Sequence, residues 1–345
     1  MEARNYEKKV AELEAALGRK QMEVDYLNKL IEIAGEDLGS DLKKYQYACI
    51  SWYRQNKGQK GFSLNDLYSY LNVSKQSVQQ MLQRQQSGME RSQQFIEKAE
   101  ALREDHPEMG CRKMALMLKL PGWGRDKTEV LFMSSGFRII YPPNYTKTTH
   151  SVPFRQFGNL IEGLVIKSIN KVVQSDITYL WVKGRFYYLV FIIDVYSRVI
   201  TGYHASEGME AEANMKALQM MIQLRGKENV KGLIHHSDRG SQYNCNKYLD
   251  ALKQHGIKVS MCNEAWENAY TERINRTIKH EYLRHRKIDC LQTLRKEMDR
   301  AIKLYNEKRP HWSLLQQMAP ARFEVYVNKL PKAKCPKMII YKPPE

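Results

Sequence analysis

The chain has 345 residues, 43% of them hydrophobic, and a formal net charge of +17 at pH 7. This length predicts two or three domains with cores of their own, and the charge favours a polyanionic partner, nucleic acid first, over a merely basic surface. A membrane role is not expected, because the longest apolar runs are far too short to span a bilayer and the opening MEARNYEKKV is too polar for a signal peptide.

The cysteines predict no metal centre. They form no C-x-x-C pair and have no zinc-finger spacing, so a zinc site is disfavoured. We expect reduced, mostly buried thiols of a cytoplasmic protein. The six positions are Cys49, Cys111, Cys245, Cys262, Cys290 and Cys335.

Residues 1–40 predict a dimerisation helix. Two rows of apolar residues repeat every seven positions between residues 5 and 36, and Lys20 interrupts one of them. β-Branched residues in one row and Leu in the other favour a parallel two-stranded coiled coil, and therefore a homodimer or higher homo-oligomer. The alternative is a single amphipathic helix that packs on its own domain. The rows are Val10, Leu17, Val24, Ile31 and Tyr6, Leu13, Leu27, Ala34.

Residues 41–90 predict a helix-turn-helix domain that binds DNA. An apolar face at Leu64, Leu67 and Leu71 is followed by Asn72, which tolerates a left-handed turn, and by Ser74 as a helix N-cap. Polar side chains of the second helix would then face outward, where Gln and Arg read base edges and Lys and Arg bind phosphates. A helical hairpin with a solvated polar face is the alternative. The outward residues are Lys75, Gln76, Gln79, Gln80, Gln83 and Arg84.

Residues 91–150 predict a second helical DNA-binding unit. Its helices are expected at 91–105, in GCRKMALMLKL and in RDKTEVLFMSSGF, the last ended by Gly136. The stretch YPPNYTKTTHSV is rich in Pro, Thr and Asn and is typical of a linker, which we extend over residues 151–165.

Residues 166–325 predict a mixed five-stranded α/β sheet flanked by helices. Three β-rich runs, VVQSDITYLWV, FYYLVFIIDV and RVITGYHA, are joined by short turns, and alternating helices and strands follow. Residues 326–345 are basic and contain proline, so we expect a flexible tail.

Three acidic residues of this region point to one metal site. Asp176 and Asp238 follow or end apolar strands, and Glu272 lies on a polar helix. Converging carboxylates repel one another by roughly 4 kcal/mol for a pair at 4 Å and an effective dielectric constant near 20. A divalent cation removes that repulsion, and oxygen ligands select Mg²⁺ or Mn²⁺.

The motifs around these residues match a known family in the right order. HSDRGSQY surrounds Asp238, ENAYTE ends in Glu272, and YNEKRPHWSLLQQMAPA follows. The region from Val172 to Phe323 resembles the catalytic core of DDE transposases and retroviral integrases, an RNase H-like fold. More narrowly, it resembles the transposases of insertion-sequence family three, with their NA-x-x-E and YN-x-x-RPH-x-SL…P signatures.

The resemblance implies a bacterial insertion-sequence transposase, cytoplasmic and nucleoid-associated, with Asp176, Asp238 and Glu272 as its metal-binding triad. Two metal ions would activate a water or a DNA 3′-hydroxyl and stabilise the leaving oxygen, so that strands at the terminal inverted repeats are cleaved and transferred to target DNA. The 33 residues between Asp238 and Glu272 are slightly fewer than the family's usual interval. Rival acids are therefore Glu267, Glu281 and Glu264.

Polar residues near the three acids have less specific roles. Lys279 matches the family's lysine that faces a phosphate, with a solvated lysine as the alternative. Arg276 contacts DNA or braces its helix together with Asn275, and Arg309 reaches DNA or packs the last helix together with His311. His236 and Ser237 position Asp238 or are structural. Asp194 is expected to cap a turn and is not part of the triad.

Two other functions remain open beside the transposase. An RNase H-like nuclease would share the triad, but the helix-turn-helix-like units and the coiled coil favour binding of specific DNA ends. A non-catalytic repressor derived from a transposase would be favoured by a lost carboxylate, and all three are present. A viral integrase is disfavoured because the amino-terminal half has no match to its histidine-cysteine zinc module.

Overall fold

The computed structural model describes residues 2–36, 42–56, 63–139, 157–262 and 264–341. The chain forms two compact units, Met1–Phe95 and Ile96–Glu345, and each is considered by itself. None of the described helices is both long and apolar enough to cross a membrane.

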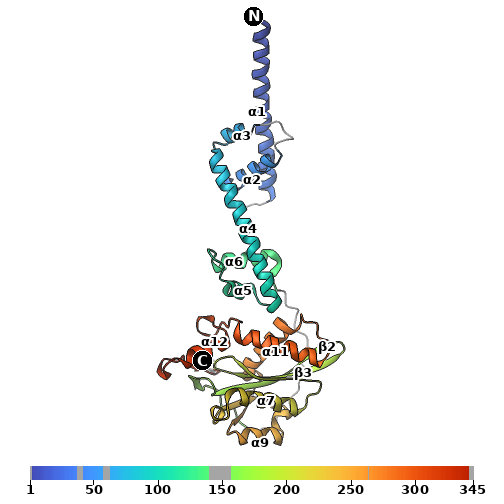
Figure 1. Ribbon diagram of the computed structural model, residues 1–345, viewed down its shortest axis with the longest axis vertical. Helices are drawn as coiled ribbons and strands as arrows, with labels where there is room; N and C mark the ends of the chain where they lie inside the picture. Colours follow the sequence, from blue (N-terminus) through green and yellow to red (C-terminus); the bar gives the residue numbers. More distant parts are fainter. Residues whose placement is uncertain (1, 37–41, 57–62, 140–156, 263, 342–345) are drawn as a thin grey trace. The chain divides into compact units, whose positions relative to one another are not determined.

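The first unit is helical, and its core closes a helix-turn-helix. It comprises α1 (Glu2–Glu36), α2 (Leu42–Gln55), α3 (Leu64–Tyr70) and the start of α4 (Lys75–Asp105) (Figure 1). Asn72 has the left-handed φ of 51° that the turn requires, and Ser74 Oγ accepts a hydrogen bond from Ser77 N at 3.0 Å. Leu67 and Val78 are buried. The predicted turn and N-cap are therefore confirmed, and α2 is an additional helix that we did not predict.

Helix α1 packs on its own domain in its second half and exposes an apolar row in its first half, so it has features of both alternatives. In its second half, Met22 and Tyr26 are buried in the core of the first unit. In its first half, Val10, Leu13 and Leu17 are 53%, 65% and 72% exposed. A row of exposed apolar side chains on one helix is the surface that a coiled-coil partner would cover. The dimer itself stays a prediction.

Helix α4 corrects the predicted break between residues 86 and 91. It runs for 31 residues from Lys75 to Asp105, across the boundary that we placed at residue 90. A single glycine inside a helix costs only about 1 kcal/mol relative to alanine, so Gly88 does not interrupt it. The boundary between the two units falls inside this helix, between Phe95 and Ile96.

The second unit begins with the end of α4, which contacts the sheet domain, and with two short helices. Helices α5 (Cys111–Leu118) and α6 (Arg125–Phe132) are followed by Gly136 with φ 85°, so the predicted stop is confirmed. At the end of α4, His106 Nδ1 lies 2.9 Å from Tyr282 Oη, and Arg300 is paired with Asp105 at 2.9 Å.

Part of the predicted linker belongs to the sheet domain. Residues 140–156 lie outside the described residues, but Ile161 is fully buried and Leu160 N donates to Ser260 Oγ at 2.9 Å. Apolar side chains at this position pack on the sheet instead of spacing two domains, so the linker predicted over 151–165 is too long at its carboxyl end.

The sheet has five strands in the order β4-β3-β2-β5-β6. The first three, β2 (Val172–Val182), β3 (Arg185–Asp194) and β4 (Ile200–Ser206), are antiparallel to their neighbours, whereas β5 (Ile234–Ser237) and β6 (Lys258–Met261) run parallel to β2. This is the mixed five-stranded sheet that we predicted, and it gives the domain an RNase H-like fold.

Helices cover both faces of this sheet, and its inner strand β3 is accordingly buried on both sides. Leu189 and Phe191 pack with α10 (Ala269–Arg276), η4 (Thr277–Leu283) and α11 (Leu291–Glu307). Val190 and Ile192 pack on the opposite face with α7 (Ala211–Arg225) and α9 (Asn246–Gln254), which follows α8 (Ser241–Asn244). Helices α7 and α9 lie on the side of the sheet opposite to α11 (Figure 1). A continuous apolar run of this kind is typical of a strand covered on both faces.

Gly202 on β4 leaves no room for a side chain. A Cβ there would overlap the backbone oxygen of Ala217 on α7 and lie 3.1 Å from Met221 Cβ. We expect Gly202→Ala to lower the free energy of unfolding by about 1–3 kcal/mol or more, because a helix backbone cannot swing aside. Chemical denaturation would measure the change. Gly158→Ala, where a Cβ meets nothing within 4 Å, is the matched control; equal stability of the two variants would contradict the close approach.

The predicted flexible tail is wrong over most of its length. Helix α12 (Pro320–Asn328) and the turn η6 (Lys332–Lys334) lead to β7 (Met338–Ile339), which pairs antiparallel with β1 (Val165–Ile166). Ile340 is fully buried. The apolar residues between the lysines supply enough buried surface to fix this segment, and only residues 342–345 lie outside the described part.

Buried neutral histidines make the second unit sensitive to acid. Burial lowers the pKa of His106 to about 4 and that of His235 to about 3. Below the ordinary pKa of about 6.5 the unfolded chain binds protons that the folded chain does not, so each histidine is expected to cost up to about 1.4 kcal/mol of stability per pH unit below that point. Denaturant unfolding between about pH 7.5 and 5 measures this slope. His106→Gln combined with His235→Gln should flatten the profile, and an unchanged slope would contradict the assignment.

Candidate active site

Two of the three predicted carboxylates lie side by side at the centre of the sheet. Strands β2 and β5 are parallel, and their last paired residues are Ser175 and Ser237. The next residues along the two strands are Asp176 and Asp238. Neighbouring strands are about 4.8 Å apart, so the fold itself brings these two aspartates to the same level.

Helix α10 brings the third acid, Glu272, toward them. Asn275, one turn further along this helix, donates from Nδ2 to Asp176 Oδ2 at 2.7 Å. The pKa of Asp176 is raised to about 8, mainly by burial and next by the charge of Asp238, with a further contribution from Glu272. Burial also raises the pKa of Asp238, while the backbone N–H of Gly240 acts the other way. The three carboxylates therefore share one electrostatic environment.

The donor chemistry of this environment fits a hard divalent cation. All three side chains offer carboxylate oxygens, and their mutual repulsion is the situation that Mg²⁺ or Mn²⁺ relieves. Asp176 and Asp238 are each held through one oxygen, by Asn275 and by Gly240 N at 3.1 Å. In the described ranges, no three or more His, Cys, Asp and Glu side chains form a group arranged to hold a metal ion.

Lys279 lies beside the same strand. Its Nζ donates to Thr178 Oγ1 at 2.7 Å and lies 3.4 Å from Tyr179 O. Burial lowers the pKa of Lys279, and the charge of Asp176 opposes that shift. The solvated alternative is therefore not what the structure shows. Two residues of α10 differ in exposure. Arg276 is exposed, whereas Asn275 is buried and donates a hydrogen bond to Asp176.

The rival acids have structural partners. Glu281 accepts two hydrogen bonds from Arg309, at 2.7 Å and 2.6 Å, and Arg309 is only 5% exposed. Glu264 and Glu267 form a capping box at the turn η3 (Ala265–Asn268) that leads into α10. For Arg309, the geometry corresponds to the packing alternative and not to an arginine that extends toward DNA.

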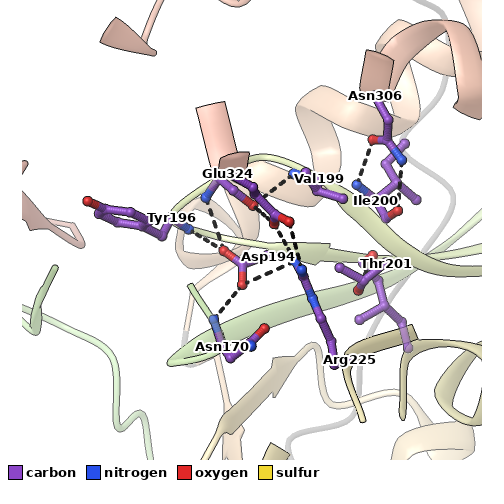
Figure 2. Close-up of polar contacts among 11 residues, drawn as sticks. Asn170, Asp194, Tyr196, Val199, Ile200, Thr201, Arg225, Asn306 and Glu324 are labelled. Atoms are coloured by element: carbon purple, nitrogen blue, oxygen red, sulfur yellow. Dashed lines mark hydrogen bonds and ion pairs between the residues drawn. The ribbon is translucent and has the colours of Figure 1, made fainter. Parts of the chain in front are cut away.

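Asp194 caps a turn, as expected. Its Oδ1 accepts hydrogen bonds from Tyr196 N and Ser197 N at 3.0 Å, and its Oδ2 accepts one from Asn170 N at 2.8 Å (Figure 2). Arg225 lies 3.6 Å from Asp194 and also donates to Glu324 of α12. Burial raises the pKa of Asp194, with Arg225 opposing it. Both oxygens of this carboxylate therefore accept hydrogen bonds that stabilise the β3–β4 turn and its neighbour Asn170.

One buried side chain close to the carboxylates, Tyr243, was not singled out in the sequence, whereas His236 was. Tyr243 is buried, and its hydroxyl lies 2.8 Å from Ser175 Oγ, next to Asp176. His236 Nδ1 lies 2.8 Å from Ser260 Oγ and so ties β5 to β6. Tyr243 is the last residue of HSDRGSQY, and this position in the motif was the available signal.

The predicted DNA-reading side chains lie together on the exposed face of α4 in the first unit. Their helix begins directly after the Ser74 cap, and every one of them is exposed. A helix-turn-helix presents such a face to the major groove. The exposed set is Lys75, Gln76, Gln79, Gln80, Gln83 and Arg84.

Comparison with protein families identifies the catalytic region. Residues 167–265 and 255–320 match two sequence profiles, each described as an integrase core domain. In solved structures, the domain is similar to the catalytic core of the integrase of HTLV-2 in complex with magnesium, at 17% identity and a TM-score of 0.37, over 48% of this chain and 99% of that one.

Bacterial insertion elements encode the relatives. A 31 kDa uncharacterised protein of insertion element IS600 from Shigella sonnei is 35% identical over 210 residues, which are 58% of this chain and 74% of that protein. The transposase of IS904 from Lactococcus lactis is 35% identical over 46% of this chain and 62% of its own length. Transposase InsF of IS3A from Escherichia coli is 30% identical over 51% and 60%.

Proposed function

This chain belongs to the DDE transposases of insertion sequences, in the group like insertion-sequence family three, and we propose that it cleaves and transfers DNA strands at the terminal inverted repeats of its element. The observation that carries the proposal is the pairing of β2 with β5, which sets Asp176 and Asp238 at one level beneath α10. Glu272 on α10 completes the proposed catalytic and metal-binding triad.

The residues of the site have distinct tasks in this proposal. When bound, two Mg²⁺ or Mn²⁺ ions would lower the pKa of the attacking hydroxyl and stabilise the departing oxygen. Asn275 fixes the orientation of Asp176 through its hydrogen bond to Oδ2, and Gly240 N fixes Asp238 through Oδ1. Lys279, held against β2 by Thr178, places a positive charge next to the carboxylates for a phosphate of the DNA.

The first unit would supply the recognition of DNA and the pairing of protomers. The exposed face of α4 that begins at Lys75 would read base edges in the terminal repeats, and Arg276 on α10 would contact the backbone. The exposed heptad row of α1 would join two protomers. We do not assign DNA binding to Arg309, because its guanidinium group is paired with Glu281.

A strand-transfer assay tests the proposal. The protein is incubated with DNA that carries the element's ends, in Mg²⁺, in Mn²⁺ and with a chelator, and with DNA of equal length whose ends are scrambled. Cleaved and joined strands are expected only with metal and only with the authentic ends. Binding to these ends without any products in either metal would contradict the catalytic proposal and support the repressor.

A further inference from the structure

A second charged site lies on the other side of α10. A cavity of about 110 Å³ opens between this helix, the β3–β4 turn, the RPH segment after α11, and α5. A single water needs about 10–15 Å³ measured in the same way, so the cavity has room for a larger polar group. We call it the basic pocket. Its charged or polar lining includes Lys113, Arg198, Tyr270, Arg273, Arg309 and His311.

The charges that line the basic pocket are not balanced. None of its described lining residues is acidic, and of the arginines only Arg309 is neutralised, by Glu281. Burial lowers the pKa of Lys113 to about 8, with the charge of Arg309 acting in the same direction. Burial likewise lowers the pKa of His311 to about 2, and the neighbouring arginines add to that shift. A pocket that disfavours further positive charge favours an anion.

Arg198 supplies the most specific indication. It is 7% exposed, and among the described residues its Nε and Nη1 have no hydrogen-bond partner. Its remaining contacts leave these two groups unused: the guanidinium carbon lies 3.9 Å from the ring centroid of Tyr270, a cation–π contact, and Nη2 lies 3.8 Å from Met338 Sδ. A buried guanidinium with two unused donors is costly unless a negative group occupies them.

The backbone of Arg198 is also in a costly conformation. Its φ is 67°, in the left-handed region that is unfavourable for a residue with a side chain. The turn tolerates this because Asp194 caps it and Arg198 N donates to Asp194 O at 2.8 Å. Strain that is held in place at a charged pocket is a common sign of a functional site.

We propose that the basic pocket binds a backbone phosphate of the DNA substrate, through the free Nε and Nη1 of Arg198. A planar guanidinium presents such a pair of N–H groups to two oxygens of one phosphate. Residues 270, 273, 274 and 277 of α10 and η4 line the pocket, while Glu272 and Asn275 lie on the other face. A phosphate bound here would hold the helix that carries Glu272. Because the phosphate belongs to the DNA substrate, the inference rests on the proposed function.

The test uses Arg198→Asn, because asparagine tolerates the left-handed backbone and the fold should survive. Lys183→Asn is the matched control, since Lys183 is an exposed cation with φ 46° in the β2–β3 turn. We expect Arg198→Asn to bind the element's ends about tenfold more weakly and to reduce the slope of log K against log salt by about 1. Lys183→Asn should bind as wild type does, and both variants should melt cooperatively.

Phosphate ethylation locates the contact. Ethylating one particular phosphate should weaken wild-type binding, and the same modification should have no effect on Arg198→Asn. Equal affinity and equal ethylation patterns for wild type and Arg198→Asn would overturn the proposal. A second result would also overturn it: inorganic phosphate stabilises wild type against thermal unfolding but does not stabilise Arg198→Asn, while both proteins bind DNA equally well. The pocket would then bind a free anion.

Failure of the proposed function has a different signature. Wild type that binds the ends without forming products would contradict catalysis alone and leave the comparison with Arg198→Asn valid. Wild type that binds neither authentic nor scrambled ends would remove the DNA substrate, and the phosphate contact would fall with it. Wild-type binding and strand transfer with unaltered behaviour of Arg198→Asn would instead overturn the pocket alone.

Discussion

The variant Asp238→Asn is expected to lose strand cleavage and strand transfer by about a thousandfold or more while keeping its affinity for the element's ends. The change keeps the shape of the side chain and removes one anionic ligand from the proposed metal site. A thousandfold loss of rate corresponds to about 4 kcal/mol of transition-state stabilisation, which lies within the several kcal/mol that a bound metal ion supplies. The measurement is product formation in Mg²⁺ together with equilibrium binding to the same DNA.

Asp250→Asn on α9 controls for the loss of one negative charge. Asp250 is exposed and lies outside the proposed site, so its variant should cleave as wild type does. Retained cleavage by Asp238→Asn would remove this carboxylate from the triad. Loss of both cleavage and DNA binding would point instead to a damaged fold, which a melting curve reveals.

Arg309→Met is expected to lower the free energy of unfolding by about 3–5 kcal/mol, because it leaves the Glu281 carboxylate partly buried without its partner. The pair lies between η4 and the end of α11, with both guanidinium bonds at 2.7 Å or less. Denaturant unfolding at neutral pH measures the effect.

The double variant Glu281→Leu with Arg309→Met separates charge from packing. Replacing both partners by apolar groups removes the unpaired charge, so the double variant should recover much of the stability that Arg309→Met loses. If the two single losses simply added, the pair would not be coupled. If Arg309→Met were as stable as wild type but bound DNA more weakly, the arginine would be a DNA contact after all.

The central sheet could be predicted from the sequence because its strands are long and apolar. β3 reads FYYLVFIID, and its burial on both faces leaves little ambiguity. The aspartates could be predicted because each directly follows or lies within such a strand, and their motifs appear in a fixed order. Their closeness needed the parallel register of β2 and β5, which a single sequence does not encode locally.

Contacts between distant short segments could not be predicted. β1 and β7 have two residues each and no periodicity, so the expected tail was wrong. The bidentate pair of Arg309 with Glu281 joins residues 28 positions apart, and charge alone did not distinguish it from a DNA contact. The strain at Arg198 is a property of its φ angle, which the sequence does not display.

The pairing of β1 with β7 bears on how the protein is made on the ribosome. Residues 165–166 emerge early, yet their partners 338–339 and the buried Ile340 come only after the rest of the sheet. At about 5–20 residues per second, the roughly 170 intervening residues take on the order of ten to thirty seconds to synthesise. During that interval Ile161 and Ile166 lack the part of their cluster that residues 314–340 supply, and nascent chains of this length are the ones that chaperones would meet.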